Sequence, residues 1–122
     1  AHGLRVSATL VFNTAQALFA AKAGAHSVAA FISRVDDIGG DGLALIRDIR
    51  QLFDRHGVEC ELTAASIRTP RQLTAAAQIG AETAAVPPAV LRTLLVHPLT
   101  DLGLDQFLND WSRRVSRSRS HP

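Results

Sequence analysis

The sequence is poor in several residue types that would define a binding site or a compartment. Its 122 residues include a single cysteine, Cys60, and no tyrosine. One cysteine excludes an intrachain disulfide and a cysteine-based metal site, so the reducing cytoplasm is the expected compartment. No apolar run reaches the roughly 18 residues of a membrane span, and no signal peptide is recognisable at the N-terminus. We therefore expect no membrane partner.

Excess charge of either sign is also missing. The formal net charge is +2, and Lys22 is the only lysine among 13 basic residues. This charge is too small to indicate a nucleic-acid partner. The histidines His26, His56 and His97 do not have metal-ligand spacing, so we expect no metal and no cofactor. The 47% hydrophobic content is typical of one globular domain or part of one.

The hydrophobic pattern predicts strands that alternate with helices. We expect strands over Val6–Phe12, Ser27–Ser33, Val58–Ala65 and Thr83–Val86, and helices over Ala15–Ala23, Gly42–His56, Pro70–Ile79 and Ala89–Val96. A final amphipathic helix is expected over residues 100–115, followed by a disordered tail over residues 116–122. Four β–α units in this order predict an α/β chain with a parallel sheet and right-handed crossovers.

Four such units suit either a small open sheet or half of a (β/α)₈ TIM barrel. The expected strands are short, with small or polar residues on one face, such as Ser7, Thr9 and Ala29. A barrel lumen accepts such residues near the end of the barrel that carries the active site. An open doubly wound sheet has longer runs of valine and isoleucine. The strands therefore favour the half barrel, which we assign to residues 1–111.

The stretch Glu61–Leu73 is the best candidate for a ligand site. An apolar strand ends in Ser66 and Arg68, after which Thr69 is expected as an N-cap and Pro70 as the first helical residue. In α/β folds the ligand binds at the carboxyl ends of the strands. A hydroxyl, a guanidinium and nearby backbone N–H groups suit a phosphate. This stretch therefore predicts a phosphate site.

Several other segments have a distinctive order and spacing. They are Thr9–Phe12, Ala15–Ala17, Ala21–Ala25, Phe31–Asp37, Ala64–Pro70 and His97–Gly103, with Phe107 and Asp110–Trp111. Together they resemble the transaldolase family, especially its short microbial members and the related fructose-6-phosphate aldolases. The resemblance runs from about Gly3 to Arg113. It implies a (β/α)₈ barrel, of which the chain would be the second half, strands five to eight plus the C-terminal helix.

The resemblance also assigns roles to residues near the expected mouth. Thr9 matches the threonine that holds the catalytic water for proton transfer, and Phe31 matches the aromatic residue that lines the pocket. Ser7 lies where many transaldolases have an asparagine that touches the substrate. The structural alternatives are a β-branched strand residue for Thr9, a core residue for Phe31 and a filler for Ser7.

Arg34, Ser66 and Arg68 match the family's phosphate site. The alternative for each arginine is a surface ion pair, worth about 0–1 kcal/mol. Two arginines and a serine at the same mouth favour the phosphate site over that alternative.

The family resemblance implies class I aldolase chemistry, in which a lysine forms a Schiff base with a ketose. That lysine belongs to the fourth strand, which lies before the segment present here. Lys22 is not a substitute, because it matches a surface lysine at a helix end. We expect a chain that binds a sugar phosphate, is inactive alone, and associates with the missing half barrel or forms a homo-oligomer. The alternatives are a fructose-6-phosphate aldolase-like enzyme, and a non-catalytic phosphate-binding module that dimerises.

Overall fold

The structure, a computed structural model, describes residues 3–119. Its elements are β1 (Ser7–Val11), α1 (Thr14–Lys22), β2 (Ser27–Phe31), α2 (Ile32–Asp37), α3 (Gly42–Arg55), β3 (Glu61–Ala65), α4 (Pro70–Ile79), β4 (Thr83–Ala84), α5 (Pro88–Leu94) and α6 (Pro98–Arg119). They fall into two compact units, residues 1–91 and residues 92–122. The predicted α/β chain of parallel β–α units with a C-terminal helix is confirmed.

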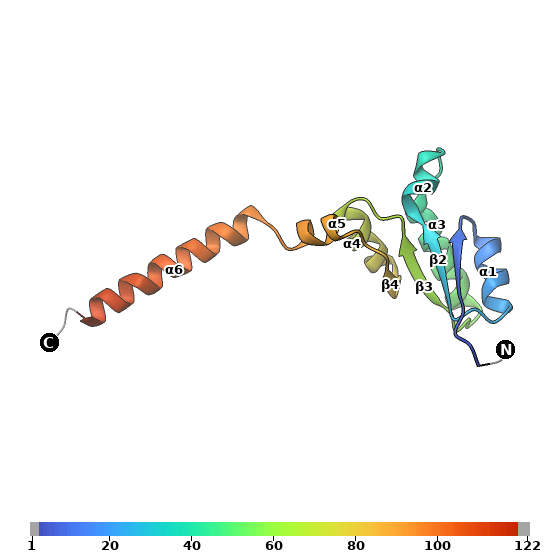
Figure 1. Cartoon of the computed structure of the whole chain (residues 1–122), viewed down its shortest axis with the longest axis horizontal. Coiled ribbons are helices and arrows are strands. Elements are labelled where there is room, and N and C mark those ends of the chain that lie inside the picture. The colour runs from blue at the N-terminus through green and yellow to red at the C-terminus, as the bar shows by residue number, and fades with distance from the viewer. Residues whose placement is uncertain (1–2, 120–122) are drawn as a thin grey trace. The chain divides into compact units, whose positions relative to one another are not determined.

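The strands form one parallel sheet in the order β1-β2-β3-β4 (Figure 1). Each strand therefore pairs with its neighbour in sequence, as a half barrel requires. Val28 of β2 lies opposite Leu62 of β3, and Ala30 lies opposite Ala64. All four side chains are fully buried.

One face of the sheet packs on the helices. Ile46, Ile49 and Phe53 of α3 are fully buried in the same hydrophobic cluster as the buried residues of β2 and β3. They recur at helical spacing along α3, which is flanked by α1 and α4. Fully burying side chains of this size contributes about 1.5–3 kcal/mol each. This face forms the core of the first unit.

The other face carries small and polar residues. Ser7, Glu61 and Thr83 are exposed, and Thr63 is partly exposed. Hydroxyls pair across neighbouring strands: Ser27 Oγ donates to Ser7 Oγ over 2.7 Å, and the Thr63 and Thr83 hydroxyls lie 2.5 Å apart. Parallel sheets are usually covered on both faces. A polar face that stays accessible is what the lumen side of an unclosed barrel presents.

The main departure from the sequence prediction is α2. We expected a strand to Ser33 and then a polar loop, but β2 ends at Phe31 and residues Ile32–Asp37 are helical. A Cβ on Gly42 would lie 2.2 Å from the Ile32 carbonyl oxygen, so α3 begins directly against α2. Asp36 Oδ1 also accepts a hydrogen bond of 2.7 Å from the Gly42 N–H. These tertiary contacts hold α2 in place, and Arg34 lies on α2 rather than on a strand.

Other boundaries shift for local reasons. β3 begins at Glu61 and not at residue 58, and β4 contains only Thr83–Ala84, since prolines at 87 and 88 cannot continue a ladder. α6 begins at Pro98 and continues to Arg119, past the predicted end at residue 115. The rest of the predicted tail, residues 120–122, lies outside the described residues.

In the second unit, α6 presents an apolar stripe of Leu104, Phe107, Leu108 and Trp111, each more than half exposed. None of the residues of α6 is buried within the described part of the chain. Between residues 3 and 119, no helix is both long enough and apolar enough to span a bilayer.

Candidate functional site

The carboxyl end of β3 leads directly into a capped helix. Thr69 is the N-cap of α4, with Pro70 at the start of the helix, as predicted. The Thr69 side chain accepts from the Gln72 N–H, and Gln72 Oε1 in turn accepts from the Arg68 and Thr69 N–H groups at 2.7 and 3.2 Å. This capping box satisfies the first amides of the helix and fixes the backbone that carries Arg68. The spacing of Thr69 and Gln72 in the sequence was a sufficient signal for it.

Ser66 turns the chain between β3 and α4 in a strained conformation. Its φ is +56°, in the left-handed region that costs a residue with a side chain about 1–2 kcal/mol. Its carbonyl oxygen accepts a 3.2 Å hydrogen bond from the Ser33 N–H of α2. Backbone strain of this kind concentrates at functional sites. Ser66 is half-buried and directly follows the last residue of β3. It therefore lies at the carboxyl end of that strand, where the phosphate site was predicted.

Arg68 is paired with a residue that the sequence prediction missed. Its Nη1 and Nη2 atoms donate to Oδ1 and Oδ2 of Asp37 over 2.8 and 2.7 Å. Both side chains remain more than half exposed. The hydrogen bond from Arg68 lowers the pKa of Asp37, and the same bond raises the pKa of Arg68. No local sequence pattern indicated this pair, because it depends on α2 being a helix.

Arg34 lies on α2, which directly follows β2, at the same carboxyl end of the strands as Ser66 and Arg68. Its guanidinium carbon is 5.1 Å from the centre of the Phe31 ring, within the range of a cation–π contact. The Phe31 ring in turn lies 5.7 Å from the ring of Phe12. Arg34 and Phe31 are thus brought together at the carboxyl end of β2, the strand next to β3, which leads to Ser66 and Arg68.

Thr9 lies in a β-bulge. The pairing of β1 with β2 shifts by one residue between Ala8 and Val11, and Leu10 has a φ of +56°. The two-residue period of the strand therefore breaks between Ala8 and Val11. Bulges next to active sites re-aim side chains, and the exposed Thr9 is at such a position.

Ser7 lies at the opposite end of the strands from Ser66 and Arg68. It is the first residue of β1 and pairs with Ser27, the first residue of β2. Four residues of strand, roughly 13 Å, separate its level from that of Phe31. The Ser7 hydroxyl accepts from Ser27 Oγ. Its place among small polar residues agrees with the filler alternative.

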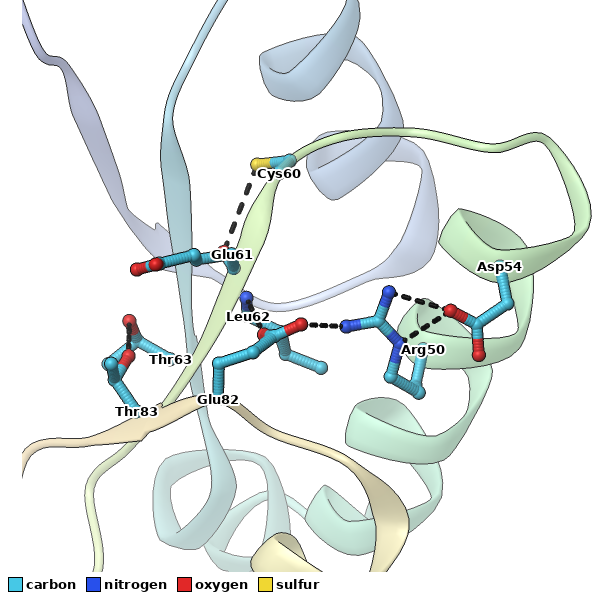
Figure 2. Close-up of polar contacts among 8 residues, drawn as sticks. All are labelled: Arg50, Asp54, Cys60, Glu61, Leu62, Thr63, Glu82 and Thr83. Carbon is cyan, nitrogen blue, oxygen red and sulfur yellow. Dashed lines mark hydrogen bonds and ion pairs between the residues drawn. The ribbon is translucent and has the colours of Figure 1, made fainter.

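The opposite edge of the sheet carries a second polar network, shown in Figure 2. Glu82 Oε2 accepts a 2.6 Å hydrogen bond from the Leu62 N–H, and Glu82 Oε1 pairs with Arg50. Arg50 also pairs with Asp54 one turn along α3, at 2.8 Å. The network joins α3, β3 and the start of β4. The sequence did not indicate it, because its members are up to 32 residues apart.

The thiol of Cys60 and the amine of Lys22 do not have the surroundings that activate a nucleophile. Burial, assisted by the Glu82 and Glu61 carboxylates, raises the pKa of the Cys60 thiol. Lys22 is the last residue of α1 and is exposed. Across residues 3–119, no group of three or more histidine, cysteine, aspartate or glutamate side chains is arranged to hold a metal ion.

Comparison with known proteins agrees with the resemblance of the motifs. Residues 1–118 match the Transaldolase/Fructose-6-phosphate aldolase family. A probable transaldolase of Symbiobacterium thermophilum is 50% identical over 117 residues, which are 96% of this chain and 54% of that protein. A probable transaldolase of Rhizobium meliloti is 53% identical over 111 residues, which are 91% of this chain and 51% of that protein. The chain therefore spans about half the length of these curated relatives.

Among solved structures, mandelate oxidase with benzoyl-formic acid aligns with a TM-score of 0.52 at 20% identity, over 69% of this chain and 25% of the other. At that identity the likeness concerns the fold alone. Parallel β–α units in sequential order, covering about half the length of the relatives, agree with half of a (β/α)₈ barrel. By the family match over nearly its whole length, the chain belongs to the transaldolase/fructose-6-phosphate aldolase family.

Proposed function

We propose that the chain is the phosphate-binding half of a transaldolase-like class I aldolase. The observation that carries the proposal is the placement of Ser66 and Arg68 after β3, next to Arg34 after β2. Two guanidinium groups and a hydroxyl at adjacent carboxyl ends of a parallel sheet form a natural cradle for a phosphate. A sugar phosphate bound there would have its carbon chain directed toward the lumen face.

The full enzyme would transfer a dihydroxyacetone unit between sugar phosphates of the pentose phosphate pathway. A lysine outside this segment would attack the ketose carbonyl and form the Schiff base. The adjacent C–C bond then breaks, and its electron pair moves into the protonated imine. Thr9, at the bulge of β1, would hold the water that transfers protons in these steps. This chain alone would bind the phosphate group of the sugar phosphate without cleaving the sugar.

Within the family, Phe31 favours transaldolase activity, whereas Ala29 matches the alanine that the fructose-6-phosphate aldolases have where many transaldolases have a serine. Phe31 lies at the mouth, where the aldolases have a tyrosine, and this chain contains no tyrosine. A phenyl ring has no hydroxyl with which to order a catalytic water. The relatives named above are also described as probable transaldolases. A fructose-6-phosphate aldolase-like activity remains the alternative within the family.

The accessible sheet face supports a second proposal, that the chain associates through it. On that face the hydroxyl of Ser7 pairs with that of Ser27, and the hydroxyl of Thr63 pairs with that of Thr83. Either the missing half barrel or a second copy of the chain would cover it, and in the latter case the chain would be a dimeric, non-catalytic phosphate-binding module. Sedimentation of the 122-residue chain as a monomer would argue against dimeric closure.

We place the protein in the cytoplasm. Its one thiol, Cys60, is free and buried, and sugar phosphates are substrates of that compartment's metabolism. The partners proposed are thus a sugar phosphate and a complementary half barrel or a second copy.

The phosphate site is tested by titrating the chain with inorganic phosphate and following backbone amide NMR shifts. We expect shifts at Ser66 and Arg68, and weaker binding in Arg34→Ala and Arg68→Ala. Arg47→Ala is the matched control, because Arg47 is an exposed arginine on α3. Equal weakening in all three variants would reduce the effect to net charge and overturn the proposed site.

The division of labour is tested by trapping. Fructose 6-phosphate and borohydride should leave the chain unmodified, because the Schiff-base lysine is outside it. A covalent adduct on Lys22 would contradict the proposal that this half is inactive alone.

A further inference from the structure

We propose that Asp37 is a positioning residue for the phosphate site: it holds one edge of the Arg68 guanidinium so that a second edge faces the phosphate. This inference rests on the proposed phosphate-binding function and extends it to a residue outside the predicted site. Asp37 does not itself touch the phosphate. It acts through Arg68.

The hydrogen bonds between the two side chains leave donors unused. Asp37 Oδ1 and Oδ2 accept from Nη1 and Nη2 of Arg68 at 2.8 and 2.7 Å, so the carboxylate meets the end of the guanidinium. An arginine has five N–H donors in a rigid plane. The end-on pair takes one from each Nη atom. The Nε–H and the outer hydrogen of a neighbouring Nη form a second fork, which matches two oxygens of a phosphate.

The carboxylate is presented by an element that is itself anchored. α2 is docked on the β3–α4 turn, where the Ser33 N–H donates to the Ser66 carbonyl and Gln72 Nε2 donates to Ser33 Oγ at 3.0 Å. Ser33 is buried, with 2% of its surface exposed. Asp37 is therefore fixed relative to the same turn that carries Ser66 and Arg68. The long side chain of Arg68 gains a defined direction before any ligand binds.

Fixing an arginine in advance lowers the entropy lost on binding. An exposed arginine has a large rotamer entropy, and a partner that already orders its side chain reduces the entropy lost when a ligand binds. The negative charge of Asp37 also repels a phosphate nearby. Salt screens this repulsion more than the ion pair itself, because the repulsion acts over a longer distance than the 2.7 Å contact that orders Arg68. The two effects therefore separate with ionic strength.

The test uses the 122-residue chain with inorganic phosphate as the probe, titrated at low salt and at about 0.15 M salt. At the higher salt, we expect Asp37→Asn to weaken phosphate binding by about two- to fivefold, the range that exposed ion pairs support. Asp37→Glu, which keeps the carboxylate, should recover part of the loss. Asp54→Asn is the matched control, because it removes one exposed carboxylate from an arginine at the other edge of the sheet. Its affinity should equal that of the parent chain.

A direct readout is the Nε–Hε NMR signal of Arg68. It should be resolved in the free chain, shift when phosphate is added, and broaden in Asp37→Asn while the amide signals of α2 keep their positions. Phosphate binding that is unchanged or tighter in Asp37→Asn at both salt concentrations would overturn the inference and leave the phosphate site intact. Failure of the parent chain to bind phosphate would instead overturn the proposed function, and with it this inference.

Discussion

At each end of the parallel strands an arginine pairs with carboxylates. The side chains of the two arginines differ in accessibility. At the amino edge, Arg50 has 15% of its side chain exposed and pairs with both Glu82 and Asp54. At the carboxyl ends, Arg68 has 57% of its side chain exposed and, among residues 3–119, pairs with one carboxylate, that of Asp37. The first arginine is enclosed by protein partners, and the second keeps donors for a ligand.

The difference is what the proposed phosphate site requires, with stability and binding assigned to opposite ends of the strands. In barrels of this type the amino edge of the strands contributes stability, and the carboxyl edge carries the site. The network of Arg50 and Glu82 joins elements from three β–α units (Figure 2). The contacts around Arg68 place side chains at a mouth instead. Changes at the amino edge should therefore alter the free energy of unfolding, and changes at the carboxyl edge should alter binding.

The largest expected effect follows from removing Glu82. Glu82→Ala leaves the N–H of the fully buried Leu62 without its acceptor and Arg50 with one carboxylate fewer. We expect a loss of about 1–3 kcal/mol in the free energy of unfolding, measured by urea denaturation. Glu82→Gln keeps an oxygen acceptor and should lose less. Equal losses in the two variants would show that the charge, and not the hydrogen bond to Leu62, matters at this edge.

A smaller effect on stability is expected at Ser66, with a clear effect on binding. Glycine adopts a φ of +56° without the side-chain clash, so Ser66→Gly should be more stable than Ser66→Ala by about 1 kcal/mol. Both variants lack the hydroxyl and should bind inorganic phosphate more weakly than the parent chain. Thermal unfolding and phosphate titration separate the two outcomes. Identical stabilities would mean that the turn relaxes when the side chain is shortened.

The smallest effect on stability is expected at Arg68, where a substitution mainly changes the pKa of Asp37. Arg68 lowers the pKa of Asp37 in the folded chain below its ordinary value of 3.8. The pair therefore stabilises the fold above that pH, and the contribution is lost as the pH falls through the lowered pKa. Arg68→Ala should return the pKa of Asp37 toward 3.8 and leave the unfolding free energy at pH 7 almost unchanged. The carboxyl ¹³C shift of Asp37 measures this titration, and a midpoint that stays low in the variant would contradict the pairing.

Much of the fold and part of the site followed from local patterns. The period of apolar residues located α3, and the Thr69–Pro70 signal located the start of α4. The strand-to-helix position of Ser66 and Arg68 indicated the carboxyl edge of the sheet. These features depend on residues within one or two helical turns, where backbone geometry alone determines which side chains are neighbours.

The features that were missed depend on contacts between distant segments. α2 looked like a strand end and a polar loop, and becomes helical where Gly42 packs on Ile32. The pair of Asp37 and Arg68 follows from that helix. The local sequence pattern of β1 did not predict the bulge at Thr9 or the left-handed φ of Leu10.

The sequence by itself determined the order of the elements, the parallel sheet and the family, because hydrophobic period, capping residues and motif spacing are properties of the linear chain. Only the tertiary structure decided which charges meet. Arg50 and Arg68 are the same residue type, and each directly follows an isoleucine. Packing against α3 and the start of β4 encloses one, while the edge of an open mouth leaves donors of the other accessible. Burial and long-range pairing, which no local pattern encodes, make one a structural link and the other a candidate for binding phosphate.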